Sequence, residues 1–305
     1  MTKTDPKDWT FKQASMYFLE DCETRNREPV KLSTLEAYRG HIKHIHETLG
    51  GRKVASFTVA DMKEFVQILV DKKLKPKTIQ TIVTTLKAII AFPRDKHLNR
   101  LFKMDFDAKV IDMPRVKSRE QKAPIISKEQ LEAAIASKDE TALLLIFLAS
   151  TGLRVSEGRG TKIGEASDAV SSWHPDQPLV RVRTQQGKNG DDASLKSDAA
   201  WRDVELPLEV HEYLKQHANM GNSRLFPQSE SQYRKVITKR GVPGFHSLRR
   251  FYRTSLFDVP AGIMRHWMGH EDGSDISNRY DKLASDPRVR REWRDKINKG
   301  FELPA

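Results

Sequence analysis

Apolar residues recur at helical spacing four times in the first hundred positions, which predicts four amphipathic helices there. The second of these has a start signal, with Ser33 as a capping residue and Glu36 three positions later. It has a stop signal at Gly50 and Gly51. The four apolar sets fall within residues 9–18, 35–49, 59–69 and 79–90. The sequence therefore predicts an all-helical domain over residues 1–105.

The pattern changes after this helical region. Residues 106–114 lose helical periodicity, and residues 115–122 are polar and basic. A polar, charged stretch between two patterned regions is typical of a linker. We therefore expect a basic linker over 106–123 and a second domain over 124–305.

The second domain mixes helices with a small sheet. Ser127 and Gln130 form a capping-box pattern ahead of an apolar run, and a strongly apolar helix over 141–150 stops before Gly152. Residues 179–184 alternate as a strand, and 201–206 are expected to pair with them. The fold class predicted for the whole chain is mainly α with a small antiparallel β-sheet.

Two loops of the second domain are less regular. The stretch 187–200 is rich in Gly, Asp and Lys and is expected to be the hairpin loop. Three glycines between positions 158 and 164 are expected to fray or break a helix, at about 1 kcal/mol each. The path of residues 158–177 therefore stays open.

Composition limits the class of protein. A chain of 305 residues is long enough for two ordinary domains. Its longest apolar run, 143–149, is far short of the roughly 20 residues needed to cross a bilayer. The first ten residues lack the apolar core of a secretory signal, so a cytoplasmic protein without membrane contact is expected. Cys22 is the only cysteine, which excludes an internal disulfide and a multi-cysteine metal site.

Charge is more informative than size. The formal net charge is +12, and such an excess of Lys and Arg favours a polyanionic partner, because each neutralised phosphate releases a condensed counterion. The alternative is a generally basic soluble protein. Charge alone therefore indicates nucleic acid as a partner and gives no information about catalysis.

Five short motifs in the second domain carry chemically useful residues. They are T-G-L-R-V-S-E at 151–157, L-K-S at 195–197 ahead of W-R-D-V at 201–204, H-S-L-R at 246–249, M-G-H at 268–270 and N-R-Y at 278–280. Taken singly, each has a structural explanation, since a lone His or Tyr is usually a packed residue. His270, Glu271, Asp272 and Asp275 suggest a metal site as an alternative, but their spacing does not match zinc ligands. The glycine patterns of ATP- and NAD-binding loops are absent.

Together, in this order and spacing, the motifs resemble the catalytic signature of the tyrosine recombinases, the family of phage integrases and chromosome-dimer resolvases. The resemblance implies an N-terminal four-helix (SAM-like) core-binding domain and a C-terminal α+β catalytic domain. It implies six catalytic residues, which are Arg154, Lys196, His246, Arg249, His270 and Tyr280. Lys196 is the lysine of the hairpin loop, and Lys188 is the alternative for that position.

Each implied role has a physical reason. Arg154 and Arg249 would offer planar forks to the phosphate, and His270 would hydrogen-bond it. Tyr280 would attack, with His246 taking its proton, because a phenol is ordinarily protonated at neutral pH. Lys196 would protonate the leaving oxygen. The resemblance implies a covalent 3′-phosphotyrosyl intermediate that needs no cofactor, metal or ATP.

The resemblance also implies the partners. These are double-stranded DNA with inverted half-sites, and a homotetramer assembled on it that passes through a Holliday junction, with an accessory DNA-bending or directionality protein left open. The basic tail after Tyr280 is expected to pack on a neighbouring protomer or on its own domain. The alternative functions are a non-catalytic DNA-binding regulator with the same fold and a Xer-type dimer resolvase.

Overall fold

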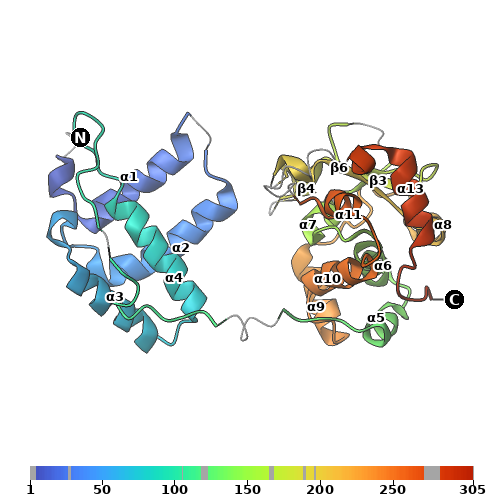
Figure 1. Ribbon diagram of the computed structural model, residues 1–305, viewed down its shortest axis with the longest axis horizontal. Coiled ribbons are helices and arrows are strands. Elements are labelled where there is room, and N and C mark those ends of the chain that lie inside the picture. Colours follow the sequence, from blue (N-terminus) through green and yellow to red (C-terminus); the bar gives the residue numbers. More distant parts are fainter. Residues whose placement is uncertain are drawn as a thin grey trace. The chain divides into compact units, whose positions relative to one another are not determined.

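A computed structural model divides the chain into two compact units, Met1–Lys122 and Ala123–Ala305 (Figure 1). It describes residues 5–26, 29–104, 106–117, 123–164, 168–187, 190–195, 197–270 and 282–304. Each unit is built around its own hydrophobic core. No helix within these described ranges has the length and hydrophobicity to cross a membrane.

The first unit contains the four predicted helices. Its elements are η1 (Pro6–Asp8), α1 (Phe11–Thr24), α2 (Leu32–Leu49), η2 (Val54–Ser56), α3 (Val59–Asp71) and α4 (Pro76–Ile90). Capping boxes start two of them, Thr10 with Gln13 at α1 and Thr58 with Asp61 at α3. The apolar faces of α1, α2 and α4 pack together, and α3 packs on α4.

The predicted start of the second helix is wrong, whereas its stop is confirmed. The helix begins at Leu32, and its N-cap, Lys31, makes no side-chain capping bond. Ser33 therefore lies inside the first turn. Gly50 is the C-cap, and its N–H donates to the carbonyl of His46.

The first part of the predicted linker packs on the helical unit. Ile111 is fully buried in the core of this unit, and Phe106 lies under the ammonium group of Lys87, 3.8 Å from ring centroid to nitrogen. The Gln80 amide donates to the carbonyl of Pro114 at 3.2 Å. Residues 106–114 lack periodicity, but their apolar side chains still bury surface, so the first unit extends further than residue 105.

The second unit is mainly helical. Its helices are α5 (Lys128–Ile135), α6 (Glu140–Thr151), α7 (Val155–Gly160), η4 (Asp198–Ala200), α8 (Leu208–His217), α9 (Glu230–Lys239), α10 (Phe245–Ser255), α11 (Ala261–Met268), η5 (Lys282–Ser285) and α13 (Pro287–Lys296). The capping box of Ser127 and Gln130 is present at α5, as predicted. Helix α6 is buried on all sides except at its first residue, and α5, α7, α8, α9 and α10 pack around it.

A small sheet completes the second unit. Its strands lie in the order β1 (Lys162–Ile163), β2 (Ser172–Trp173), β3 (Leu179–Val182) and β6 (Arg202–Glu205). The predicted antiparallel pairing is confirmed, with Val180 opposite Val204. Strands β1 and β2 add a short parallel pair. The expected hairpin loop, 187–200, contains β5 (Asp192–Ser194), which pairs with β4 (Thr184–Gln186) just before the loop in a second, two-stranded sheet.

The glycine-rich segment after α6 forms a helix, contrary to the prediction. Helix α7 continues through Gly158 and ends at Gly160, and both glycines are buried. A Cβ on Gly158 would lie 2.8 Å from the Leu148 side chain of α6, and one on Gly160 would lie 3.0 Å from the backbone nitrogen of Gln186 in β4. These glycines therefore allow α7 to fit between α6 and β4, and this packing compensates for their low helix propensity.

The basic C-terminal helix, α13, packs on its own unit, which is one of the two arrangements expected from the sequence. Arg290 pairs with Glu205 of β6 at 2.9 Å, and Arg291 donates to the carbonyl of Leu206 at 2.8 Å. Phe301, beyond the helix, is buried in the core.

We predict that Gly152→Ala destabilises the second unit strongly. Gly152 has a φ of +66°, and an added Cβ would lie 2.2 Å from the ring of Tyr252, a fully buried side chain. Left-handed strain and overpacking together should cost about 2–5 kcal/mol in urea unfolding. Gly241→Ala is the matched control, because Gly241 has a φ of +73° with nothing within 4 Å of the added Cβ. An equal loss in both variants would contradict the packing argument.

Candidate active site

The turn between α6 and α7 places Arg154. Helix α6 ends at Gly152 in the left-handed conformation, and the buried Leu153 anchors the chain before α7 begins. Arg154 is the N-cap residue of α7 and has an extended backbone. Its side chain is 28% exposed, so its guanidinium can contact a ligand.

A buried carboxylate orients Arg154. One oxygen of Glu157 accepts a hydrogen bond from Arg154 Nη1 at 2.6 Å, and the other accepts one from the backbone nitrogen of Arg154 at 3.0 Å. Burial disfavours the charged form of Glu157. The charges of Arg202 and Arg154, and the hydrogen bonds from Arg154, outweigh it and lower the pKa of Glu157. The carboxylate is therefore ionised and fixes the start of α7.

Helix α10 contributes Arg249, which is 4% exposed. Its Nη1 donates to the carbonyl of Gly152 at 2.6 Å, and its Nη2 donates to the carbonyl of Met268. Burial, and then the positive charge of Arg154, lower the pKa of Arg249 to about 10. The group remains charged at neutral pH, and it joins the ends of α6 and α11.

Two histidines accompany the arginines. His246 lies in the first turn of α10, and His270 follows Gly269 at the end of α11. Nη2 of Arg249 lies 3.1 Å from Nε2 of His270, and since arginine only donates, Nε2 is the acceptor. Burial, followed by nearby arginine charges, lowers the pKa of both histidines. Both are therefore mainly neutral at pH 7. Because Nε2 of His270 accepts from Arg249, its Nδ1 carries the proton and can donate.

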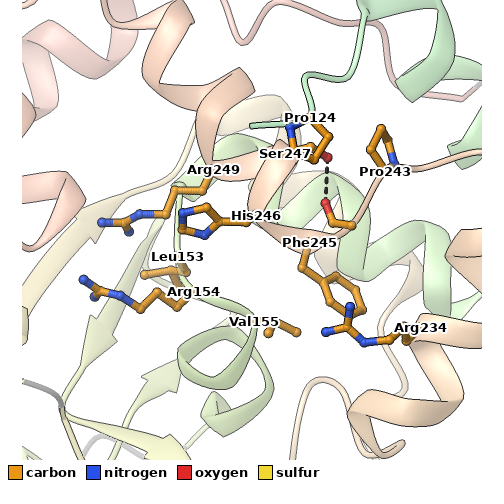
Figure 2. A pocket seen from close by; sticks show the side chains of 11 residues that line it. Pro124, Leu153, Arg154, Val155, Arg234, Pro243, Phe245, His246, Ser247 and Arg249 are labelled. Atoms are coloured by element: carbon orange, nitrogen blue, oxygen red, sulfur yellow. Dashed lines mark hydrogen bonds between the residues drawn. The ribbon is translucent and has the colours of Figure 1, made fainter. Parts of the chain in front are cut away.

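Four of the six predicted side chains thus come from three segments to one place. A pocket of about 350 Å³ is lined by Arg154, His246 and Arg249 (Figure 2). Figure 2 shows the two guanidinium groups pointing to the same side, with the His246 ring beside them. His270 joins this group through its contact with Arg249. The arrangement suits a bound phosphate, which accepts hydrogen bonds from planar guanidinium forks.

The other two predicted residues, Lys196 and Tyr280, lie outside the described residues, as does Lys188. Their placement in this site stays a prediction. The metal alternative also depends on Glu271, Asp272 and Asp275, which fall outside the same ranges. Across the described part of the chain, no cluster of three or more His, Cys, Asp or Glu side chains is arranged to hold a metal ion.

Sequence reasoning did not assign a role to Arg202. This residue is 3% exposed, and its Nη2 donates to Glu157 at 3.0 Å. A signal was present, because Arg202 precedes Val204 by two positions in a strand and therefore lies on the same, buried face. A buried arginine requires an ionic or hydrogen-bonded partner, but its identity depends on tertiary structure.

Comparison with known proteins gives structural matches only, since no protein-family model and no curated protein matches the chain. The Tn1549 transposon integrase, in complex with transposon right end DNA, aligns with a TM-score of 0.65 and 17% identity over 91% of this chain and 99% of its own. A lambda integrase dimer bound to a COC′ core site aligns with a TM-score of 0.59 and 18% identity over 93% of this chain and 78% of its own. The chain has the fold of the tyrosine recombinases.

A third match supports the same fold. A lambda integrase tetramer bound to a Holliday junction aligns with a TM-score of 0.56 and 16% identity over 88% of this chain and 77% of its own. The tyrosine recombinase fold includes both units, because each match covers most of the chain. The combination of a helical unit with a mainly helical unit that carries small sheets is therefore confirmed.

We predict that acid destabilises the second unit partly through His266 of α11. Its Nε2 donates to the carbonyl of Asp203 at 2.9 Å, and burial, followed by the charge of Arg290, lowers its pKa to about 4. In the unfolded chain this imidazole takes up a proton near pH 6.5. The contribution of neutral His266 to stability is therefore fully present above that pH and is lost as the pH drops towards 4. The difference between the pKa of His266 in the unfolded and the folded chain corresponds to about 3 kcal/mol of unfolding free energy. The loss of unfolding free energy between neutral pH and about pH 4.5, measured by urea unfolding, should be smaller in His266→Gln than in wild type. An equal loss in both proteins would contradict the assignment.

Proposed function

We propose that this protein is a site-specific DNA recombinase that breaks and rejoins duplex DNA through a covalent 3′-phosphotyrosyl intermediate. The observation that carries the proposal is the grouping of Arg154 and Arg249 with two neutral histidines, on a fold shared with integrases that were solved with DNA. Because one fold can host several functions, the proposal depends on the side chains at the site and not on the fold alone.

The two arginines suit phosphoryl transfer. Negative charge grows on the nonbridging oxygens as an oxygen nucleophile attacks, and cations fixed in advance stabilise it. Arg249 uses two of its nitrogens on backbone carbonyls, which holds it rigid, and Arg154 is oriented by Glu157. This preorganisation takes the part that a metal ion plays in many nucleases.

The remaining roles follow from proton movement. Tyr280 is proposed as the nucleophile and His246 as the group that takes its proton, because a neutral imidazole is the form that accepts one. Lys196 is proposed to protonate the leaving 5′ oxygen, with Lys188 as the alternative. The phosphotyrosyl bond conserves the energy of the phosphodiester, so rejoining requires no ATP.

The proposed partner is double-stranded DNA with inverted half-sites, bound by a homotetramer that passes through a Holliday junction. The similar lambda integrase tetramer was solved on a Holliday junction, and the net charge of +12 favours a DNA partner. An accessory DNA-bending or directionality protein is compatible with this reaction. Integration, excision and dimer resolution share one chemistry, so a Xer-type resolvase is a variant of the same proposal.

The second candidate, a DNA-binding regulator without catalysis, differs in one measurable property. We predict that the wild-type protein forms a covalent adduct with a nicked suicide duplex, taken from the DNA that flanks its gene, and that Tyr280→Phe forms none. The adduct should persist in denaturing gels. A regulator would show only salt-sensitive, reversible binding to the same duplex.

Arg154→Ala provides a second arm of this experiment. It should bind the duplex with nearly unchanged affinity and lose about 10²–10³-fold in adduct formation, because only the transition state requires both forks. Equal rates in Arg154→Ala and wild type would rule out the two-arginine assignment.

We predict that Lys196→Ala slows strand cleavage by about 10²-fold and that a substrate with a 5′-phosphorothiolate leaving group restores the rate, because a thiolate needs no acid. The two candidate lysines flank β5 in the sequence, with Lys188 before Asp192 and Lys196 after Ser194. Lys188→Ala is therefore the matched control. If it shows the slow, thiolate-rescued behaviour instead, Lys188 is the general acid.

A further inference from the structure

Arg202 of β6 is the most completely enclosed arginine near the site. Its side chain is 1% exposed, so neither DNA nor solvent reaches it. All three guanidinium nitrogens donate hydrogen bonds, Nε to the carbonyl of Trp267 at 2.9 Å, Nη1 to the carbonyl of Ala200 at 2.7 Å and Nη2 to Glu157 at 3.0 Å. A buried arginine with every nitrogen satisfied is fixed in position.

These three partners belong to three of the segments that hold predicted catalytic residues. Ala200 closes the hairpin segment that contains both candidate lysines, Glu157 orients Arg154, and Trp267 lies three residues before His270. Two further bonds hold β6 to the end of α11, from His266 to the carbonyl of Asp203 and from Trp267 to Glu205. Arg202 therefore connects elements that are far apart in the sequence.

The guanidinium of Arg202 also packs closely against Gly269, in the turn after α11. A Cβ at Gly269 would lie 2.6 Å from Nη1 of Arg202, so no other residue fits there without displacing the guanidinium. The turn that presents His270 is thus shaped around Arg202. This explains in physical terms why a glycine precedes the histidine in this chain.

Arg202 also changes the electrostatics of Arg154. Glu157 is 1% exposed, and its single negative charge is shared between two arginines. Without Arg202, the same carboxylate would neutralise Arg154 alone and reduce its attraction for a phosphate. With Arg202, the two arginines and Glu157 together retain a net positive charge next to Arg249.

We propose that Arg202 is a positioning residue for DNA cleavage, which holds half of the Glu157 carboxylate so that Arg154 stays available to the scissile phosphate. The same guanidinium sets the turn of His270. The inference rests on the proposed function, because the effect is read from cleavage. Arg202 does not touch the substrate, so it should affect the rate of the chemical step and leave DNA affinity unchanged.

The test measures single-turnover adduct formation at saturating suicide duplex, together with the dissociation constant of the intact duplex. Arg202→Met keeps the length of the side chain and removes its charge. We expect the rate to fall by about 100-fold, as for an active group displaced by about 1 Å, with the dissociation constant within about threefold of wild type. Adding Glu157→Gln removes the carboxylate that would then neutralise Arg154, while glutamine can still cap its backbone nitrogen. The double variant should therefore recover at least about 10-fold in rate.

Lys299→Met is the matched control for loss of a buried cation. Lys299 is also largely buried, and it pairs with Glu209 at 2.8 Å. Within the described residues, no hydrogen bond or ion pair joins Lys299 or Glu209 to Glu157 or to α11. The thermal stability of the Lys299→Met variant should fall, whereas its rate of adduct formation should stay within about threefold of wild type. A comparable loss of rate in this control would show that Arg202 acts only through general stability, and would overturn the inference.

Four other outcomes are decisive. An Arg202→Met variant that cleaves at the wild-type rate, or a double variant no faster than Arg202→Met, overturns the inference. If Arg202→Met does not fold, Arg202→Lys decides, because it retains the charge but cannot serve three acceptors, and it should lose about 10-fold in rate. A wild-type protein that forms no adduct overturns the proposed function itself, which separates the two failures.

Discussion

A single buried carboxylate, that of Glu157, determines the geometry of the candidate site. It caps α7, orients Arg154 and neutralises part of the charge of Arg202 in one set of contacts. Three guanidinium groups would otherwise repel one another at short range, and after burial this repulsion, chiefly from Arg154, is the second cause that lowers the pKa of Arg249. The carboxylate and the backbone carbonyls compensate enough of this charge for the site to fold, and the net positive charge that remains is what a phosphate requires.

Much of the fold could be predicted because it depends on local pattern. The apolar spacing gave the four helices of the first unit, and the alternation in 179–184 and 201–206 gave a strand pair whose register is Val180 opposite Val204. The errors occurred where tertiary contacts outweigh local preference. Ser33 has the chemistry of a cap but lies within α2, and Ile111 anchors a segment that has no periodicity. Gly158 weakens a helix in isolation, yet α7 needs it to approach α6.

The candidate site was predictable to a similar extent. Short motifs identified Arg154, His246, Arg249 and His270, and the structure brings these four together, because each motif places its residue at a helix end or within the first two turns of a helix. Arg202 was missed since its partners, Glu157, Ala200 and Trp267, are spread over more than a hundred positions of the sequence. The choice between the two hairpin lysines depends on side-chain placement, which spacing alone does not determine.

The carbonyl contacts of Arg249 have a further consequence for substitution. Its two terminal nitrogens donate to the last turns of two helices, at Gly152 and Met268, where the partial negative charge of each helix end is concentrated. A lysine has one nitrogen and no planar fork, so it cannot bridge two helix termini in this way. Exchange of the two basic residues at this position would therefore loosen the junction of α6 and α11 before any difference in phosphate chemistry came into effect. The same side chain therefore holds two helix ends together and lines the candidate pocket.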